Sequence, residues 1–505
     1  MAGKRISAKT TKQITAQRDT FAEELTRYIE KSGMTIQKLS AVTGLGRTAI
    51  QHTIAGKLVP AKNFIDRLCA ALPMTPEQRD ELTERYAREK AGEAVYYNRS
   101  RLKQMIESLP QYRISDRITG ISVDADRMKD CTIKSVSGLV NVNNMMRTLL
   151  LKEFSLPSPK LITAIPFEYN VFFEMLLQIF YASRAELRLE HFFRMYTCAQ
   201  GEKNVNIDTL RGALKIAICA AIDYSPYYHY VDREAGECLL TAYPYFMISS
   251  DFSVLVSADF SSALLTGDRE LREELIRHSE RIKSRSALMI TRVGQTEMFE
   301  VFANSSPYFH SSIEYQPCLT AYVTEDILQK RLGDIPHREE IMRTVKEKFF
   351  MTPKQELGNT KNYFTKDGLI SFAKTGKMTN MPGALLDPMS PRERLYFLES
   401  MKADLGNYIM LSEDFAVPSF MQVICLTNRS VIISCLTEEI KFCCLLTEPG
   451  LCGAVEDLID SLGDSGLTES VGIFTAVIDS CIEMIKRSDV EICADDLVPE
   501  TELDA

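Results

Sequence analysis

The chain has 505 residues, of which 45% are hydrophobic and 25% are charged, a composition typical of globular proteins that excludes wholesale disorder. A chain of this length exceeds one compact core and predicts two to four domains. The net charge of −9 is unevenly distributed, because residues 1–110 hold 19 Lys and Arg against 12 Asp and Glu, and the remainder holds 40 against 56. A basic N-terminal part on an acidic body favours a polyanionic partner for the N-terminal part alone.

Membrane proteins, secreted proteins and zinc proteins fit the sequence poorly. The longest strongly apolar run, residues 216–222, is far shorter than the roughly 20 residues that span a bilayer. The basic residues 1–13 precede no apolar signal-peptide core. The 13 cysteines form no CxxC pair, which favours reduced, buried thiols over a zinc site. We therefore expect a cytoplasmic protein with no membrane contact, no metal and no cofactor.

The N-terminal fifth of the chain reads as a basic arm followed by helices. Residues 1–18 are predicted to be a flexible arm, which is either solvated or reaches a neighbouring minor groove. A first helix is predicted by apolar positions at helical spacing, and Gly33 would end it. These positions are Phe21, Leu25, Tyr28 and Ile29.

Three shorter helices are predicted next. Thr35 would cap the first of them and Gly44 would end it, with Ile36, Leu39 and Val42 on its inner face. The second would begin at Gly46 or Thr48 and end at Gly56. Its inner face would consist of Ala49, Ile50 and Thr53 or Ile54. The third would be capped by Asn63 and would bury Phe64, Leu68 and Leu72.

The stretch from Thr35 to Pro60, TIQKLSAVTGLGRTAIQHTIAGKLVP, resembles the Cro-type repressors, also called the XRE family of helix-turn-helix regulators. That family has a pattern like TQEELAEKLGVSRSTISRIENGKRKP. The matching positions here are Leu39, Ser40, Gly44, Leu45, Arg47, Thr48, Ile50, Gly56, Lys57 and Pro60. The resemblance covers about residues 19–80 and implies an all-α domain that binds double-stranded DNA.

The resemblance also implies which residues meet the DNA. The second helix would present Gly46, Arg47, Thr48, Gln51 and His52 to a major groove. Arg47 would contact guanine, and Gln51 or His52 would contact base edges or phosphate. Gln37 and Lys57 would contact phosphates, which position a protein without specifying sequence.

The sequence departs from the family pattern at several positions, which leaves a second interpretation open. Ile36, Gly46 and Ala55 stand where the family usually has polar groups, and Thr53 stands at an apolar position. A single domain should therefore bind DNA weakly, so the hypothesis requires a homodimer. The alternative is a domain that has lost DNA binding and serves dimerisation or protein contact.

Residues 81–110 are predicted to form a linker helix that Gly92 divides. A narrow apolar stripe along it, at Leu82, Tyr86, Val95, Leu102, Met105 and Ile106, suggests pairing with its twin in a dimer.

The remaining chain is predicted to be a large α/β or α+β body. Helices are expected at 139–154 and 167–182 and a strand at 186–196. A pattern of three strands and a helix occurs at 246–282 and again at 420–462. It suggests two duplicated halves, residues 111–300 and 301–495, rather than a chance pairing of common units. An acidic tail follows at 496–505.

The body contains no recognisable catalytic motif. Gly376-Lys377 lacks the spacing of a phosphate-binding loop. The cluster of residues 224–233, YSPYYHYVDR, could line a small-ligand pocket, but a turn that leads into an aromatic strand is favoured. Asp251, Asp259 and Asp268 are interpreted as turn residues rather than metal ligands.

These observations predict a sequence-specific DNA-binding transcriptional regulator whose body dimerises and senses an unidentified small molecule or protein. The alternative is an enzyme or defence effector whose helix-turn-helix domain represses its own gene or docks the protein on DNA.

Overall fold

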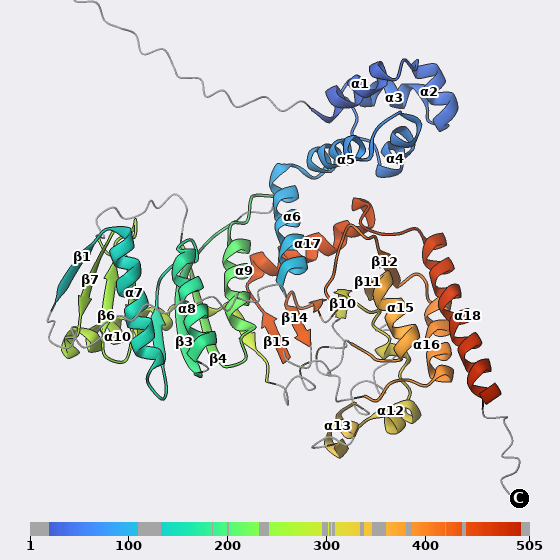
Figure 1. The fold of residues 1–505 in the computed structure, drawn as a ribbon. Coiled ribbons are helices and arrows are strands. Elements are labelled where there is room, and N and C mark those ends of the chain that lie inside the picture. The colour runs from blue at the N-terminus through green and yellow to red at the C-terminus, as the bar shows by residue number, and fades with distance from the viewer. Residues whose placement is uncertain are drawn as a thin grey trace, which may run out of the picture. The chain divides into compact units, whose positions relative to one another are not determined.

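The computed structural model describes residues 20–109, 133–183, 185–198, 201–231, 242–294, 301, 305, 309–333, 338–345, 360–379, 386–419, 421–436 and 441–495. The predicted arm at 1–18 and acidic tail at 496–505 lie outside these residues. The chain divides into two compact units, residues 1–96, here called the N-terminal unit, and residues 97–505, here called the body (Figure 1). Among the described residues, no helix has both the length and the hydropathy that crossing a membrane requires.

The N-terminal unit is all-helical. Its helices are α1 (Phe21–Lys31), α2 (Ile36–Thr43), α3 (Arg47–Ile54), α4 (Lys62–Ala71) and α5 (Pro76–Ala91), and α6 (Glu93–Ser108) leads into the body. Leu25, Leu39, Ile50 and Leu68 are fully buried at its centre, one from each of the first four helices. Removing these side chains from water is the main favourable term in holding such short helices together.

Helix α5 belongs to the same core. Leu82 is completely buried, and Tyr86 is 2% exposed. The ring of Tyr86 packs edge-to-face on Phe21 of α1, with centroids 5.5 Å apart, and its hydroxyl donates to the carbonyl of Pro60 at 2.7 Å. The first half of the predicted linker helix is therefore the fifth helix of the N-terminal unit.

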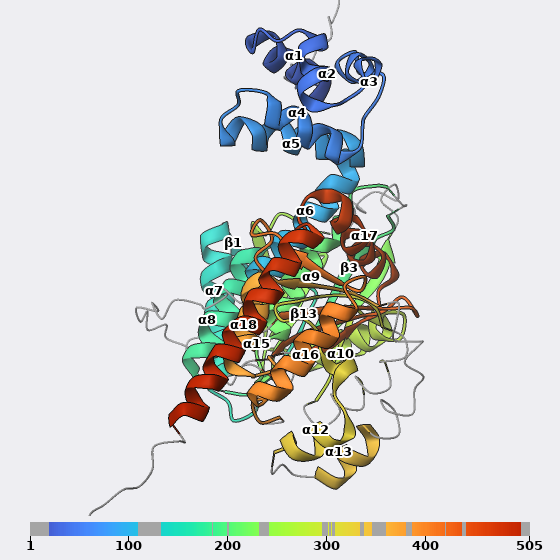
Figure 2. The same cartoon turned by 90° about the vertical axis from the view of Figure 1, so that its right-hand side faces the viewer.

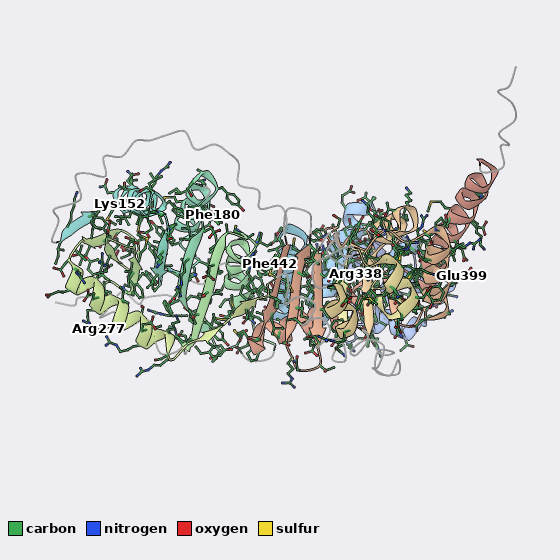
Figure 3. The ribbon with its side chains drawn as sticks, turned by 90° about the horizontal axis from the view of Figure 1, so that it is seen from below. Lys152, Phe180, Arg277, Arg338, Glu399 and Phe442 are labelled. Atoms are coloured by element: carbon green, nitrogen blue, oxygen red, sulfur yellow. The ribbon has the colours of Figure 1, made fainter. Side chains whose placement is uncertain are left out.

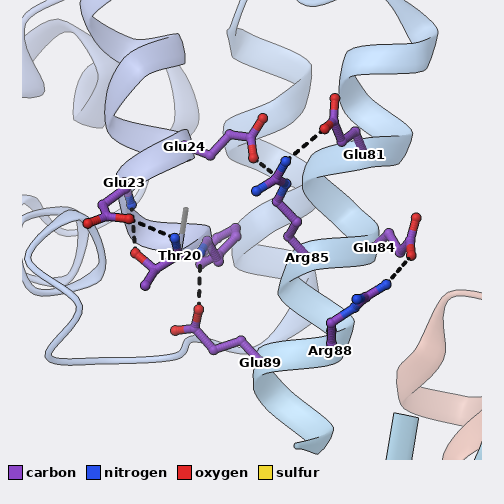
Figure 4. Close-up of polar contacts among 9 residues, drawn as sticks. Thr20, Glu23, Glu24, Glu81, Glu84, Arg85, Arg88 and Glu89 are labelled. Carbon is purple, nitrogen blue, oxygen red and sulfur yellow. Dashed lines mark hydrogen bonds and ion pairs between the residues drawn. The ribbon is translucent and has the colours of Figure 1, made fainter. Parts of the chain in front are cut away.

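Polar contacts fasten α5 to α1 from outside the core (Figure 4). Arg85 of α5 forms an ion pair with Glu24 of α1 and donates to Glu81 one turn earlier at 2.8 Å. Glu89 accepts from the backbone N–H of Phe21 at 3.1 Å, which satisfies one of the donors that a helix N-terminus leaves unpaired. The start of α1 is thus tied to the end of α5.

Two local predictions in this unit are wrong. Val42 is 62% exposed, because the inner face of α2 is formed by Leu39 and Thr43, which lie four residues apart. Asn63 is not the cap of α4, since the helix begins at Lys62 and Ala61 occupies the cap position.

The first half of the body is an eight-stranded mixed sheet. Its strands are β1 (Lys134–Ser137), β2 (Lys160–Thr163), β3 (Leu187–Tyr196), β4 (Ile222–Val231), β5 (Tyr245–Ile248), β6 (Ser253–Val256), β7 (Ser262–Thr266) and β8 (Ala287–Leu288). They lie in the order β1-β7-β6-β5-β2-β3-β4-β8, in which β2, β3 and β4 are parallel and the other neighbours antiparallel.

Helices cover both faces of this sheet. They are α7 (Leu139–Phe154), α8 (Asn170–Ser183), α9 (Asn206–Ala217) and α10 (Arg269–Lys283). Figure 3 shows α7 and α8, marked by Lys152 and Phe180, on one face and α10, marked by Arg277, on the other. The predicted helix at 167–182 begins three residues late, at Asn170, and residues 167–169 lie in the connection between β2 and α8.

The second half is a seven-stranded mixed sheet. Its strands are β9 (Ile290–Arg292), β10 (Phe309–Glu314), β11 (Lys361–Thr365), β12 (Tyr408–Leu411), β13 (Met421–Leu426), β14 (Val431–Leu436) and β15 (Lys441–Leu446), in the order β12-β11-β10-β13-β14-β15-β9. Its described helices are η4 (Thr320–Tyr322), α12 (Glu325–Arg331), α13 (Arg338–Val345), α15 (Lys366–Thr375), α16 (Pro391–Ala403), α17 (Pro449–Ser465) and α18 (Val471–Asp495). Helix α18 packs across α15 and α16 (Figure 2).

The two halves have the same topology. Strands β9 to β15 occupy the places that β1 to β7 occupy in the first sheet, with the same parallel and antiparallel neighbours. The predicted pattern of three strands and a helix is β5-β6-β7-α10 in one half and β13-β14-β15-α17 in the other. Even β8, which pairs with β4, has a counterpart in Thr468, which bridges to Leu411 of β12.

The changeover between the sheets lies at Met289. Its N–H donates to the carbonyl of Pro226 in β4 at 3.0 Å, and its carbonyl accepts from the N–H of Thr447 at 3.4 Å. Strand β9 therefore belongs to the second sheet although it precedes residue 301, where the sequence pattern placed the second half. The chain has the predicted fold class, an all-α N-terminal unit followed by an α/β body.

Helix α6 joins the two halves of the body. Leu102, Met105 and Ile106 are buried in a core that contains residues of both sheets. Arg99 makes two hydrogen bonds to Asp457 of α17, at 2.7 and 2.9 Å. Five side chains of the predicted stripe are thus buried within the chain, Leu82 and Tyr86 in the N-terminal unit and Leu102, Met105 and Ile106 in the body, and these five are not available for pairing with a twin.

Candidate DNA-binding surface

The turn between α2 and α3 is fixed by side-chain hydrogen bonds. Thr35 caps α2 by accepting from the N–H of Lys38 at 3.2 Å. At the other end, Gly44 adopts a φ of +65°, which other residues rarely adopt, and turns the chain out of the helix. The hydroxyl of Ser40 then donates to the carbonyl of Leu45 at 2.6 Å, so the chain enters α3 in a defined direction.

Buried side chains set the rotation of α3 about its own axis. Ile50 and Thr53 are completely buried against the other helices, and the hydroxyl of Thr53 donates to the carbonyl of Ala49 at 2.9 Å. The hydroxyl is satisfied within its own helix, which explains how Thr53 replaces an apolar residue here. Because these two positions face inward, the opposite side of α3 faces solvent.

All seven residues predicted to contact DNA are exposed. They are Gln37, Gly46, Arg47, Thr48, Gln51, His52 and Lys57. The structure brings four of them onto one face of α3, because Arg47 and Thr48 lie one turn before Gln51 and His52. Gln37 lies in the first turn of α2, and Lys57 lies just after α3.

The N-terminus of α3 adds a second kind of contact. Gly46 occupies its cap position and has no side chain to bond the first N–H groups of the helix. These groups are free to donate to an anion, and the helix dipole favours negative charge at the same end. A backbone phosphate is an acceptor of this kind.

Two further cationic residues at this surface were not identified from the sequence. Lys38, next to Gln37 in α2, is exposed. Arg67 of α4 is exposed as well, and its guanidinium lies 2.7 Å from the point where a Cβ on Gly44 would stand. The sequence places Arg67 in α4, one turn after Phe64, but it does not show that this part of α4 lies beside the turn between α2 and α3.

The turn acids of the body have structural partners. Asp268 caps α10 by accepting from the N–H of Leu271 at 2.8 Å. Asp259 accepts from the hydroxyl groups of Ser257 and Ser261, which lowers the pKa of its carboxyl to about 2. Within the described ranges, no group of three or more His, Cys, Asp or Glu residues could hold a metal ion.

Comparisons with known proteins assign the N-terminal unit. Residues 20–82 match a family model described as a helix-turn-helix domain, and this part of the chain is a helix-turn-helix domain of the kind that binds DNA. The match reaches Leu82, the first buried apolar residue of α5. No curated protein matches the chain.

Among solved structures, one similar chain is the archaeal chromatin protein TrmBL2, whose structure is described as showing a novel mode of DNA binding. It is 9% identical, and the alignment covers 53% of this chain and 92% of that chain with a TM-score of 0.22.

Proposed function

We propose that the protein is a cytoplasmic, sequence-specific transcriptional regulator of the Cro type, which binds double-stranded DNA through α3. The observation that carries the proposal is the exposed face of α3, on a helix-turn-helix domain, with Arg47, Thr48, Gln51 and His52 side by side. A helix of this diameter fits the major groove, where the pattern of donors and acceptors distinguishes all four base pairs.

The exposed residues divide into two roles. Arg47 has the fork of donors that pairs with the O6 and N7 atoms of guanine, and Gln51 can bond the N6 and N7 atoms of adenine. Gln37, Lys38, Lys57 and the open N-terminus of α3 would bind phosphates and so set the register of the helix in the groove.

We infer that the active species is a homodimer. One α3 helix of eight residues reads few bases, and Gly46 and Ala55 add no side chain that could bond DNA. Two N-terminal units on one two-fold axis would read two half-sites about one helical turn apart, roughly 10 base pairs. The body would supply the contact between the copies and respond to an effector, with no catalytic role.

Selection of bound duplexes from a random pool by the full chain, followed by footprinting, tests this proposal. The expected result is an inverted repeat whose half-site centres lie about 10 base pairs apart. Failure to enrich any sequence would contradict the proposal and favour the interpretation in which the domain mediates only dimerisation or protein contact.

A further inference from the structure

The first half of the body contains a crevice of about 910 Å³ at the carboxyl ends of its parallel strands. Residues that follow β2, the last residues of β3 and β4, and residues of α10 line it. In open α/β sheets, the carboxyl ends of parallel strands are where ligands bind, and small-molecule pockets have volumes of about 300–1,000 Å³. Position and size therefore both suit a small molecule.

The aromatic side chains of this crevice are held in place by their surroundings. Phe260 is stacked between Tyr169 and Tyr245, with ring centroids 4.1 and 5.2 Å away and planes within 9° of parallel. Its φ is +58°, an unfavourable value for a bulky residue, and such strain is typical of ligand-binding positions. The stack fixes Tyr245 and Phe260, which both line the crevice, as one aromatic wall.

Phe167 is fixed equally well on the other side. A Cβ at Gly212 of α9 would stand 2.4 Å from the Cδ1 atom of Phe167, so the ring is seated directly against the helix backbone. Its edge also meets the ring of His191 at 4.8 Å between centroids. A planar ligand entering the crevice would find these aromatic surfaces already arranged, which reduces the entropy cost of binding.

Cationic and polar groups lie at the same crevice. Arg194 of β3 and Arg285, which follows α10, line it with exposed side chains, and among the residues that the structure describes Glu168 is the one acid in the lining. Arg194 pairs in register with His229 of β4. The Nδ1 atom of His229 is buried without a hydrogen-bond partner among the described residues, so it can bond a ligand.

Burial and the nearby charge of Arg194 lower the pKa of His229. The imidazole is therefore neutral at pH 7 and offers one donor and one acceptor. The segment predicted as a turn before an aromatic strand is instead continuous strand, with Pro226 inside β4, and His229 and Tyr230 of that strand line the crevice.

The equivalent place in the second half is packed differently among the described residues. Helix α15 begins at Lys366, directly after β11 ends at Thr365, whereas nine residues, 197–205, separate the end of β3 at Tyr196 from the start of α9 at Asn206. A Cβ at Gly368 would stand 1.8 Å from the carbonyl oxygen of Tyr315, and the hydroxyl of Thr365 donates to that same carbonyl at 2.9 Å. The two halves therefore share one topology but differ, among the described residues, in how the chain leaves the middle parallel strand.

We propose that this crevice binds a small molecule that combines a flat aromatic ring with an anionic group, either a carboxylate or a phosphate. The ring would lie among the aromatic side chains that line the crevice, Phe167 and the stacked Tyr245 and Phe260, and the anion would take hydrogen bonds from Arg194 and Arg285. The proposal rests on the effector-sensing part of the proposed function. Its test requires no DNA, so a negative result for the crevice would not contradict DNA binding by α3, and a negative result for DNA binding would not contradict the ligand site.

The test uses two fluorescent probes and the full chain. The probe 1-anilinonaphthalene-8-sulfonate has an aromatic body and an anion, and N-phenyl-1-naphthylamine has the same rings without the anion. Both are titrated into the wild-type chain and into the double variant Arg194→Gln/Arg285→Gln. The matched control is Arg277→Gln/Arg281→Gln, which neutralises two arginines of α10 that pair with Glu274 outside the crevice.

The expected result is a rise of about tenfold or more in the Kd of the sulfonate for the crevice variant, because two charge-assisted hydrogen bonds are lost. The neutral probe and the control variant should stay within about twofold, since they keep the aromatic wall and lose no anion contact. An equal change in both variants, or no change in the crevice variant, would overturn the proposal.

Displacement of the sulfonate distinguishes the two sources of the anion. Adenosine 5′-monophosphate represents aromatic phosphates and 4-hydroxybenzoate represents aromatic carboxylates, with adenosine and inorganic phosphate as the separated parts. Displacement by one of the two anions supports the proposal and identifies the source. Displacement by neither, or by inorganic phosphate alone, contradicts it.

Discussion

Replacing Leu82 with Ala should loosen the whole helix-turn-helix domain, although Leu82 lies outside α1 to α4. Its side chain is completely buried among residues of the other helices, and Leu→Ala changes at such sites cost about 2–5 kcal/mol. A unit of this size has a stability of roughly 4–12 kcal/mol, so the loss is a large fraction of it. At about 1.4 kcal/mol per factor of ten, backbone amides that exchange by global opening of the unit should exchange between about 30 and several thousand times faster.

Hydrogen exchange measured by mass spectrometry on the full chain can observe this change. Peptides from α1 to α4 should lose protection, and peptides from the body should not. Leu58→Ala is the matched control, because Leu58 lies in the same unit and is 42% exposed, and such surface changes cost less than about 0.5 kcal/mol. If the two variants behave alike, α5 is not part of the core.

Three other changes test separate parts of the account. Gly44→Ala forces a Cβ onto a φ of +65° and should destabilise the N-terminal unit by about 1–2 kcal/mol. Gly46→Ala, at a φ of −64° with open space around it, should cost less than about 1 kcal/mol, since it loses only the preference of an N-cap for glycine over alanine; equal melting temperatures would refute the role of the turn. Burial lowers the pKa of His191 to about 4, so below pH 6.5 the unfolded chain binds a proton that the folded chain does not bind. The free energy of unfolding of the body should therefore fall by on the order of 3 kcal/mol as pH falls from 6.5 to 4. Thermal melts across that range should show a weaker pH dependence for His191→Gln than for the wild type, and an unchanged dependence would contradict this assignment. Lys57→Ala should weaken binding to all DNA sequences alike and reduce the slope of log K against log salt by about 1 per bound copy, and a loss confined to one sequence would contradict a phosphate contact.

The sequence was informative where structure depends on neighbouring residues. Thr35, Gly44 and the apolar spacing of Leu39 and Ile50 are local signals. They predicted helices α2 and α3 and the exposed face of α3. The meanders β5-β6-β7 and β13-β14-β15 were likewise predictable, because consecutive antiparallel strands need only short turns.

Contacts between residues far apart in the chain could not be predicted from the sequence. The spacing of Leu82 and Tyr86 fits a stripe that faces a twin helix as well as one that faces its own domain, and only contacts with Phe21 and Pro60 decide between them. The crevice of the body had no pattern to reveal it, since Phe167, Arg194 and Phe260 come from separate segments that the parallel pairing of β2 with β3 and the antiparallel pairings of β2, β5, β6 and β7 bring together. Exposure of the predicted DNA-contacting residues is established by the fold, and their individual roles remain predictions.

The most direct test of the central claim is the affinity of the full chain for its selected duplex, measured by fluorescence anisotropy, in wild type and in the double variant Arg47→Ala/Gln51→Ala. Each base contact contributes about 1–3 kcal/mol of discrimination, so the variant should lose at least about 30-fold in specific affinity and retain its binding to random duplex. Arg79→Ala, which removes an exposed arginine of α5, should bind like the wild type. Unchanged specific binding by the double variant would contradict the assignment of α3 as the reading helix.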